Sequence, residues 1–146
     1  MKKIQLLVIV LFLAAGAAFG QAAQQHLEQG IQFYKNKQYS QAITSFNASI
    51  KLAPTSPTPW FNRGQAYFYS GNIDKAIADY SQVLTLSPNY LDALFQRGLA
   101  KNRLKDHLGA IADYTRGIAI APNDSQFYYN RGIAYYDKGD LDPAFA

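Results

Sequence analysis

The hydrophobic and polar positions of this chain repeat with a period of 34 residues. Within residues 57–88, aromatic and small residues recur at helical spacing, first over residues 60–68 and again over residues 76–84. Gly71 lies between the two runs and is typical of a turn. Pro88 ends the second run because proline cannot donate a hydrogen bond inside a helix. The pattern therefore predicts two helices joined by a tight turn.

This helical pair recurs on both sides of the central unit. The recurring positions are Trp60, Gly64, Tyr67, Ala76, Tyr80 and Pro88 in the second unit, His26, Gly30, Phe33, Ala42, Phe46 and Pro54 in the first, and Leu94, Gly98, Ala110, Tyr114 and Pro122 in the third. A shorter fourth unit begins at Ser125. One hairpin cannot bury both of its faces, so stacked units must stabilise one another.

The pattern also predicts where helices begin and how charges pair. We expect helices at residues 23–35 and 40–52 in the first unit and at 91–104 and 108–119 in the third. Asp74 and Asp142 each fit an N-cap, the latter followed by proline at the first helical position. Charged residues recur at the repeat period, so they are expected to serve every unit. The expected ion pairs are Asp79–Arg97 and Asp113–Arg131, across the repeat junctions, and Ser45 would leave Arg63 without an acidic partner.

Over residues 23–146 the chain resembles the tetratricopeptide repeat, in its length of 34 residues and in the order aromatic, Gly, Tyr, Ala, aromatic, Pro. The resemblance implies an all-α, right-handed solenoid of stacked helix-turn-helix units. The units would span residues 23–56, 57–90, 91–124 and, in part, 125–146. It also implies a protein-binding scaffold or adaptor that is not an enzyme.

Residues 1–20 are typical of a secretory signal peptide, because two lysines precede an apolar run that ends in small residues. Cleavage would place the protein in a bacterial periplasm or outside the cell. The apolar run from Leu6 to Gly20 is short for a membrane span, which needs about 20 residues. An uncleaved leader that anchors the chain to the inner membrane is the alternative.

Composition excludes several classes of site. The chain has no cysteine, which excludes disulfides, thiolate nucleophiles and cysteine-ligated metals. Without Lys2 and Lys3 the net charge of +4 falls to +2, too little to indicate a nucleic-acid partner. His26 and His107 occupy repeat positions that hold other residues elsewhere, so they are interpreted as structural. No phosphate-binding or dinucleotide motif occurs. We expect no catalytic residue, metal, cofactor or small-molecule substrate.

In the resembled family the first helix of each unit lines the concave face of the solenoid. The corresponding residues here are Leu27, Ile31, Tyr34, Phe61, Gln65, Phe68, Tyr69, Phe95, Leu99, Asn102, Arg103, Tyr129, Ile133 and Tyr136. Some family members hold a peptide's carboxylates with Lys and Asn on this face, but Leu27 and Ile31 occupy the matching positions in the first unit. The resemblance thus implies an apolar or amphipathic peptide as ligand. The alternative is that Phe61, Phe95 and Tyr129 pack on one another or on a missing segment.

The last unit stops within its second helix, so the sequence is interpreted as a fragment of a longer protein. If it is complete, the uncapped last helix predicts self-association. An enzyme whose catalytic domain lies beyond residue 146, with these repeats as its recruiting arm, is the rival function. A nucleic-acid reader is disfavoured because the concave face carries few cations.

Overall fold

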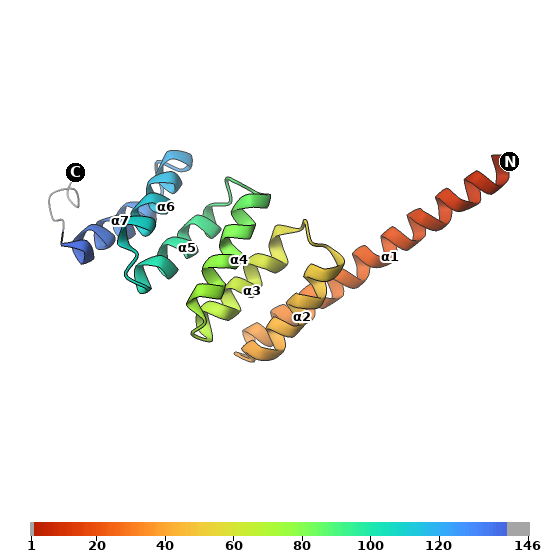
Figure 1. Cartoon of the computed structure of the whole chain (residues 1–146), viewed down its shortest axis with the longest axis horizontal. Helices are drawn as coiled ribbons and strands as arrows, with labels where there is room; N and C mark the ends of the chain where they lie inside the picture. The colour runs from red at the N-terminus through yellow and green to blue at the C-terminus, as the bar shows by residue number, and fades with distance from the viewer. Residues whose placement is uncertain (1, 140–146) are drawn as a thin grey trace.

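The computed structural model describes the backbone of residues 2–139 and the side chains of residues 16 and 18–139. This part of the chain contains seven α-helices and no strand (Figure 1). The helices are α1 (Lys2–Lys35), α2 (Tyr39–Leu52), α3 (Pro57–Tyr69), α4 (Ile73–Leu86), α5 (Leu91–Arg103), α6 (His107–Ile120) and α7 (Ser125–Lys138). The prediction of an all-α solenoid is confirmed.

The first helix is longer than the sequence pattern predicted. It begins at Lys2 and not near Ala23, and it projects beyond the helical body (Figure 1). The reason is that nothing between these residues ends a helix, since the segment has no proline and is rich in Leu, Ala and Gln. Most of the predicted signal peptide, residues 1–20, lies outside the residues whose side chains are described. Within the described part, no helix is both long enough and apolar enough to cross a bilayer.

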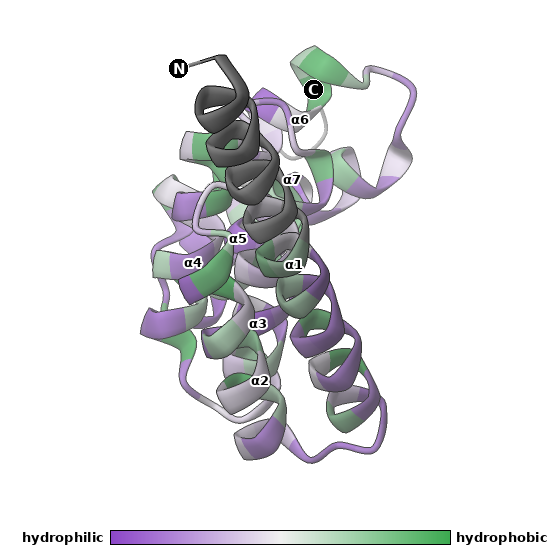
Figure 2. Ribbon diagram, turned by 90° about the vertical axis from the view of Figure 1, so that its right-hand side faces the viewer, coloured by the Kyte–Doolittle hydropathy of each residue, from purple (hydrophilic) through white to green (hydrophobic). Residues whose placement is uncertain are grey.

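The helices pack as consecutive hairpins whose first helices line one side. α1 packs on α2, α3 on α4 and α5 on α6, and each second helix also packs on the first helix of the next unit. The first helices α1, α3, α5 and α7 contact their counterparts in neighbouring units, whereas α2, α4 and α6, as described, do not contact one another. The stack therefore curves towards the first helices. Hydrophobic and hydrophilic segments alternate along the coloured parts of the helices (Figure 2).

The core repeats one contact between a glycine of the first helix and an aromatic ring of the second. The pairs are Gly30 with Phe46, Gly64 with Tyr80 and Gly98 with Tyr114. A Cβ atom at Gly64 would lie 2.8 Å from the Tyr80 Cε1 atom, closer than atoms approach without displacement. Phe46 and Tyr80 are fully buried, and Tyr114 is 1% exposed. Glycine lets the two helices approach closely enough to bury these rings.

Each turn between a first and a second helix has one residue in the left-handed conformation, at the same repeat position. Gly71 and Gly139 have φ of 86°, and Lys37 and Lys105 occupy the same repeat position with φ of 59° and 64°. In the first turn the Gln38 amide donates to the Phe33 carbonyl at 2.9 Å, which closes the helix end. The left-handed conformation thus recurs even where the sequence offers lysine.

The prediction that Asp74 caps α4 is wrong. The helix begins one residue earlier, at Ile73, so Asp74 lies in the first turn and Asn72 takes the cap position without a side-chain hydrogen bond. Side-chain caps occur instead at Asp106, which accepts from the Gly109 amide, and at Asp124, which accepts from the Gln126 amide. The expected cap at Asp142 lies outside the described residues.

Candidate functional site

The recurring arginines and aspartates pair within units. Arg63 donates from Nε and Nη2 to the two carboxylate oxygens of Asp79 at 2.8 and 2.7 Å. Arg97 forms the same two-pronged contact with Asp113 at 2.9 and 2.5 Å. The predicted pairs Asp79–Arg97 and Asp113–Arg131, and the expectation that Arg63 lacks an acidic partner, are therefore wrong. Each arginine reaches the second helix of its own hairpin, because the glycine beside it brings that helix close.

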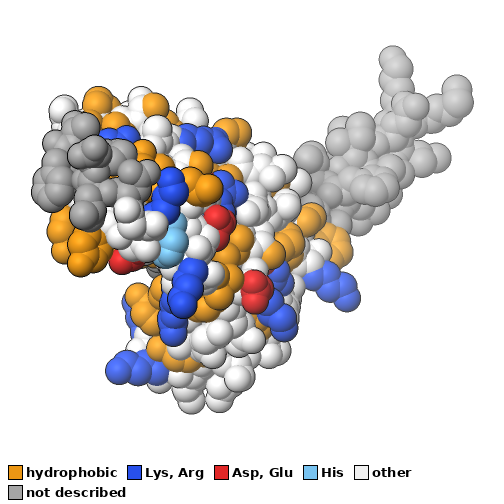
Figure 3. Space-filling view, turned by 60° about the vertical axis from the view of Figure 1, so that its left-hand side comes forward, with side chains coloured by type: hydrophobic (Ala, Val, Ile, Leu, Met, Phe, Trp, Pro, Cys, Tyr) orange, Lys and Arg blue, Asp and Glu red, His pale blue; other side chains and the backbone are white. Residues whose placement is uncertain are grey.

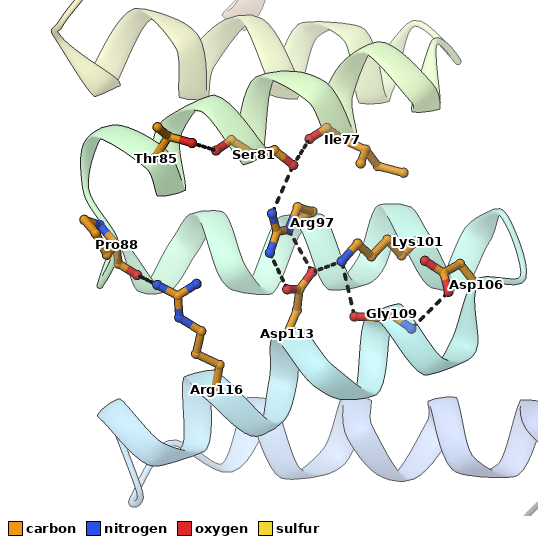
Figure 4. Close-up of polar contacts among 10 residues, drawn as sticks. All are labelled: Ile77, Ser81, Thr85, Pro88, Arg97, Lys101, Asp106, Gly109, Asp113 and Arg116. Carbon is orange, nitrogen blue, oxygen red and sulfur yellow. Dashed lines mark hydrogen bonds and ion pairs between the residues drawn. The ribbon is translucent and has the colours of Figure 1, made fainter.

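The third guanidinium nitrogen of each arginine reaches back to the preceding unit. Arg63 Nη1 donates to Asn47 Oδ1 at 2.6 Å, and Arg97 Nη1 donates to Ser81 Oγ at 3.0 Å (Figure 4). Arg131 makes a longer contact of the same kind with Thr115 Oγ1, at 3.4 Å. Arg63 and Arg97 thus each join three consecutive helices, which stiffens the junctions between units.

The surroundings of these pairs differ between units. In the third unit Lys101 adds a second cation to Asp113 at 2.8 Å (Figure 4). In the second unit the equivalent position is Tyr67, and its ring and that of Trp60 lie beneath the Arg63 guanidinium. Burial raises the pKa of Asp79, while the hydrogen bonds and charge of Arg63 oppose that rise. These buried pairs hold the scaffold together and offer no free acid or base.

The concave face is held by contacts between successive first helices. Three such contacts join residues 35 positions apart: Tyr34 with Tyr69, Phe68 with Arg103 and Asn102 with Asp137. The first is an edge-to-face ring pair at 6.0 Å between centroids, and the second places a guanidinium 5.3 Å from a ring centroid. The third is a hydrogen bond of 2.9 Å. The contacts that join successive first helices therefore change from aromatic at the N-terminal end of the concave face to polar at its C-terminal end.

Most of the residues predicted for the concave face are accessible there. Tyr69, Arg103, Tyr129 and Tyr136 are exposed, and the half-buried members are Ile31, Tyr34, Phe61, Gln65, Phe68, Phe95, Leu99, Asn102 and Ile133. Leu27 is 8% exposed and packs in the core with Ala42, Phe46 and Ala66, so it offers almost no surface.

The central aromatic residues of this face serve both the core and the surface. Phe61 stacks on Tyr90 with centroids 5.3 Å apart, and Phe95 meets Phe127 edge-on at 5.7 Å. These contacts fix each ring in one orientation while part of it stays accessible. Tyr129, in contrast, is 71% exposed. The arrangement presents rigid aromatic surface, which can bind apolar side chains with little loss of entropy.

Four tyrosines gather near the N-terminal end of the concave face. The rings of Tyr34, Tyr39 and Tyr69 lie 6.0 to 6.4 Å apart. Burial and the neighbouring hydroxyls of Tyr69 and Tyr39 raise the pKa of Tyr34 to about 12. Burial likewise raises the pKa of Tyr80, whose hydroxyl is buried without a hydrogen-bond partner among the described residues. Tyr34 and Tyr80 are therefore neutral near pH 7.

The two histidines have structural surroundings. His107 opens α6, and its Nδ1 atom lies 2.6 Å from Asn102 Oδ1, which links the turn to the concave face. His26 lies half-buried in α1. The described residues contain no group of three or more His, Asp or Glu that could hold a metal ion.

The repeat positions predict which residues line the concave face, but they did not predict the contacts that join successive first helices. The sequence contains a signal for these contacts, because the pairs of residues 35 positions apart change from aromatic to polar along the chain. The arginine contacts to the preceding unit were also missed. Their signal was weaker, since Asn47, Ser81 and Thr115 differ in type.

The sequence matches the family of the tetratricopeptide repeat over residues 57–90, and a TPR repeat profile over residues 30–71 and 103–139. A search of curated proteins found no match. The fold is similar to the first TPR domain of Spaghetti (RPAP3) bound to the HSP90 peptide SRMEEVD, with 25% identity, a TM-score of 0.79, and 82% of this chain and 95% of that chain covered. It is also similar to a crystal structure of MamA, with 28% identity, a TM-score of 0.81, and 84% and 72% covered.

A third similar structure is the Sgt2 TPR domain from Aspergillus fumigatus, with 25% identity, a TM-score of 0.75, and 85% of this chain and 83% of that chain covered. The profile matches extend over more than half of the chain and fall on its helical hairpins. The chain belongs to the tetratricopeptide repeat family.

Proposed function

We propose that the chain is a protein-interaction module that binds an apolar or amphipathic peptide segment on its concave face. The observation that carries this proposal is the row of half-exposed and exposed aromatic side chains held in place by contacts between successive first helices. Phe68 and Tyr69 lie at its centre, with centroids 5.5 Å apart in an edge-on pair. A preformed surface of this kind binds a flexible segment without having to order itself first.

The similar domain of Spaghetti (RPAP3) supports a peptide ligand, because its structure was solved with an HSP90 peptide. The ligand of the present chain differs in chemistry. That peptide, SRMEEVD, carries three acidic side chains, whereas the N-terminal half of the concave face presents Ile31, Tyr34 and Tyr69. Apolar side chains of a ligand fit this half, and the polar half around Asn102 and Arg103 fits its hydrogen-bonding groups.

A protein ligand is favoured over a nucleic acid by the charge of the concave face. Arg103 is engaged above the Phe68 ring, and Asp137 accepts a hydrogen bond from Asn102 beside it. A surface that tracks a phosphate backbone needs a run of cations. The described part of the concave face has none, so we infer a peptide that is near neutral.

We also propose that the chain acts outside the bacterial cytoplasm, on the strength of residues 1–20. Two lysines followed by an apolar run are typical of an export signal. The exposed side chain of Phe19 fits a segment that does not belong to the packed body. The intact mass of protein purified from the cell envelope tests this directly, since cleavage removes about 20 residues.

The peptide proposal is tested by selecting ligands from a random peptide display library and measuring their affinity by calorimetry. Tyr69→Ser and Tyr129→Ser should each weaken binding, because both remove exposed aromatic area from the concave face. Tyr128→Ser is the matched control, since Tyr128 is also exposed on α7 but its hydroxyl donates to the Pro122 carbonyl, away from that face. Equal losses in all three variants, with helicity retained, would refute the proposed site.

A further inference from the structure

The two edges of the helical stack differ in charge. The turns between first and second helices lie along one edge, the lower one in Figure 1, and the connections between units lie along the other. The turn edge comprises residues 35–40, 69–75 and 103–109, which carry five Lys and Arg and two Asp. The opposite connections, residues 52–58, 86–92 and 120–126, carry two Asp and no Lys or Arg.

The third turn of this edge carries two leucines where the other units carry polar residues. Leu104 is 45% exposed and Leu108 is 64% exposed. The equivalent residues are Asn36 and Ser40 in the first unit and Ser70 and Asp74 in the second, all exposed. No other leucine in the described part of the chain is exposed. The fold does not need leucine here, since two sister turns form without it.

The polar groups of this turn are already occupied, which holds the two leucines in a fixed frame. The Asp106 carboxylate accepts from the Gly109 amide at 3.0 Å, and the Asp106 amide donates to the Lys101 carbonyl at 2.9 Å. Asn102 Oδ1 is taken by His107 at 2.6 Å. The exposed features that remain are the two leucines and the cations flanking Leu104.

Arg103 and Lys105 flank Leu104 on both sides, and both are exposed. The one acidic group of the turn, Asp106, is directed to the α6 amide. In the view of Figure 3, Lys and Arg side chains are interspersed with hydrophobic ones. An apolar pair bordered by cations complements a surface that is apolar and acidic.

We infer that the tip of the third hairpin, formed by Arg103, Leu104, Lys105 and Leu108, is a second docking site, which binds an acidic amphipathic helix of a partner protein. The site lies at the turn edge and borders the concave face, with which it shares Arg103. A partner can therefore engage both surfaces or only one.

An anionic membrane also presents apolar and acidic groups, but it is the less favoured ligand for this site. The α1 helix starts at the opposite edge of the molecule and runs towards the turn edge (Figure 1). At about 1.5 Å per residue, its first residues lie roughly 50 Å from the first turn. If the leader is retained, a membrane that held the apolar start of α1 would therefore lie far from the third hairpin tip. A partner protein can bind the third hairpin tip wherever the start of α1 lies.

The test uses the full chain and a labelled, helical peptide of roughly 18 residues with leucine along one face and glutamate beside it. Fluorescence anisotropy should show saturable binding that weakens with added salt. The same peptide with lysine in place of glutamate should not bind. Leu104→Ser with Leu108→Asp gives this turn the residues of the second unit, so the fold is retained, and affinity should fall about tenfold or more.

Tyr69→Ser with Tyr136→Ser is the control, because it alters the concave face and should leave the affinity for the acidic peptide unchanged. Three results would overturn the inference. The first is equal affinity of the turn variant and the unaltered chain, and the second is loss of binding in the concave-face variant. The third is tighter, leucine-dependent binding to vesicles of phosphatidylserine and phosphatidylcholine, or to a second copy of the chain, than to the peptide.

Discussion

The pairing of Arg63 with Asp79 predicts a large energetic coupling inside the second unit. The two side chains are 16% and 5% exposed, and two charge-assisted hydrogen bonds join them. Asp79→Ala leaves the guanidinium without its carboxylate, and removing one partner of a buried pair costs about 3–5 kcal/mol. We expect about 3 kcal/mol of lost unfolding free energy, at the lower end, because Arg63 can turn partly to solvent.

A double-mutant cycle separates this pair from the alternative across the junction. Arg63→Met also removes the contacts to Asn47 and Trp60, but the cycle cancels those losses. The coupling between Asp79 and Arg63 should be about 2–3 kcal/mol, whereas Asp79 and Arg97 should be additive to within about 0.5 kcal/mol. The outcome decides whether each arginine serves its own hairpin.

Urea unfolding is the appropriate assay, followed both by circular dichroism and by the fluorescence of Trp60, the single tryptophan of the chain. Trp60 lies 4.7 Å from the Arg63 guanidinium and reports on this junction. Free energies are compared for variants in which the two transitions coincide, since repeat arrays can lose cooperativity. A coupling of Asp79 with Arg97 that exceeds its coupling with Arg63 would refute the reasoning.

Three further predictions concern the turns and the tyrosines. Lys37→Gly and Lys105→Gly should each raise the unfolding free energy by about 0.5–1 kcal/mol, because both lysines have positive φ. Lys51→Gly within α2 is the control and should lower the unfolding free energy by about 1 kcal/mol. Equal losses at all three sites would contradict the turn geometry. Tyr80→Phe should stabilise the chain by about 1 kcal/mol in urea unfolding, since its buried hydroxyl has no partner in the described part, and a clear loss would mean that the hydroxyl is bonded. The folded pKa of Tyr34, about 12, lies above its ordinary value of 10.0, so the contribution of the neutral Tyr34 hydroxyl to stability is complete below pH 10 and is lost as pH rises towards 12. In the Tyr34→Phe variant, the unfolding free energy measured between pH 9 and 11 should therefore fall less steeply with pH. An unchanged slope would contradict the raised pKa.

The helical hairpins could be predicted from the sequence because their period, glycines and prolines each have a local physical cause. The ion pairs could not. Each aspartate lies 16 residues after one arginine and 18 residues before the next, as Asp79 does between Arg63 and Arg97. Both spacings recur with the repeat, so periodicity alone cannot choose between them. The choice depends on how closely the glycine at each crossing lets the two helices approach.

The repeat positions of the proposed concave-face residues follow from the sequence, but the exposure of each side chain does not. Leu27 occupies the same repeat position as Phe61 and Phe95, yet it is buried while they are half-buried. A leucine side chain is shorter than phenylalanine and ends within the core, whereas a phenylalanine ring extends beyond it. The exposure of Leu104 and Leu108 could not be predicted from the helical pattern, because that pattern distinguishes buried from exposed positions only within helices and these leucines flank a turn.

The central claim, that the concave face binds a peptide, is tested most directly by mapping the backbone amide shifts of the isotopically labelled chain by NMR as a selected peptide is added. The account predicts that the shifted amides lie mainly in α3, α5 and α7, with the strongest effects around Tyr69, Arg103 and Tyr136. Saturable binding with shifts concentrated in α2, α4 and α6 would contradict it.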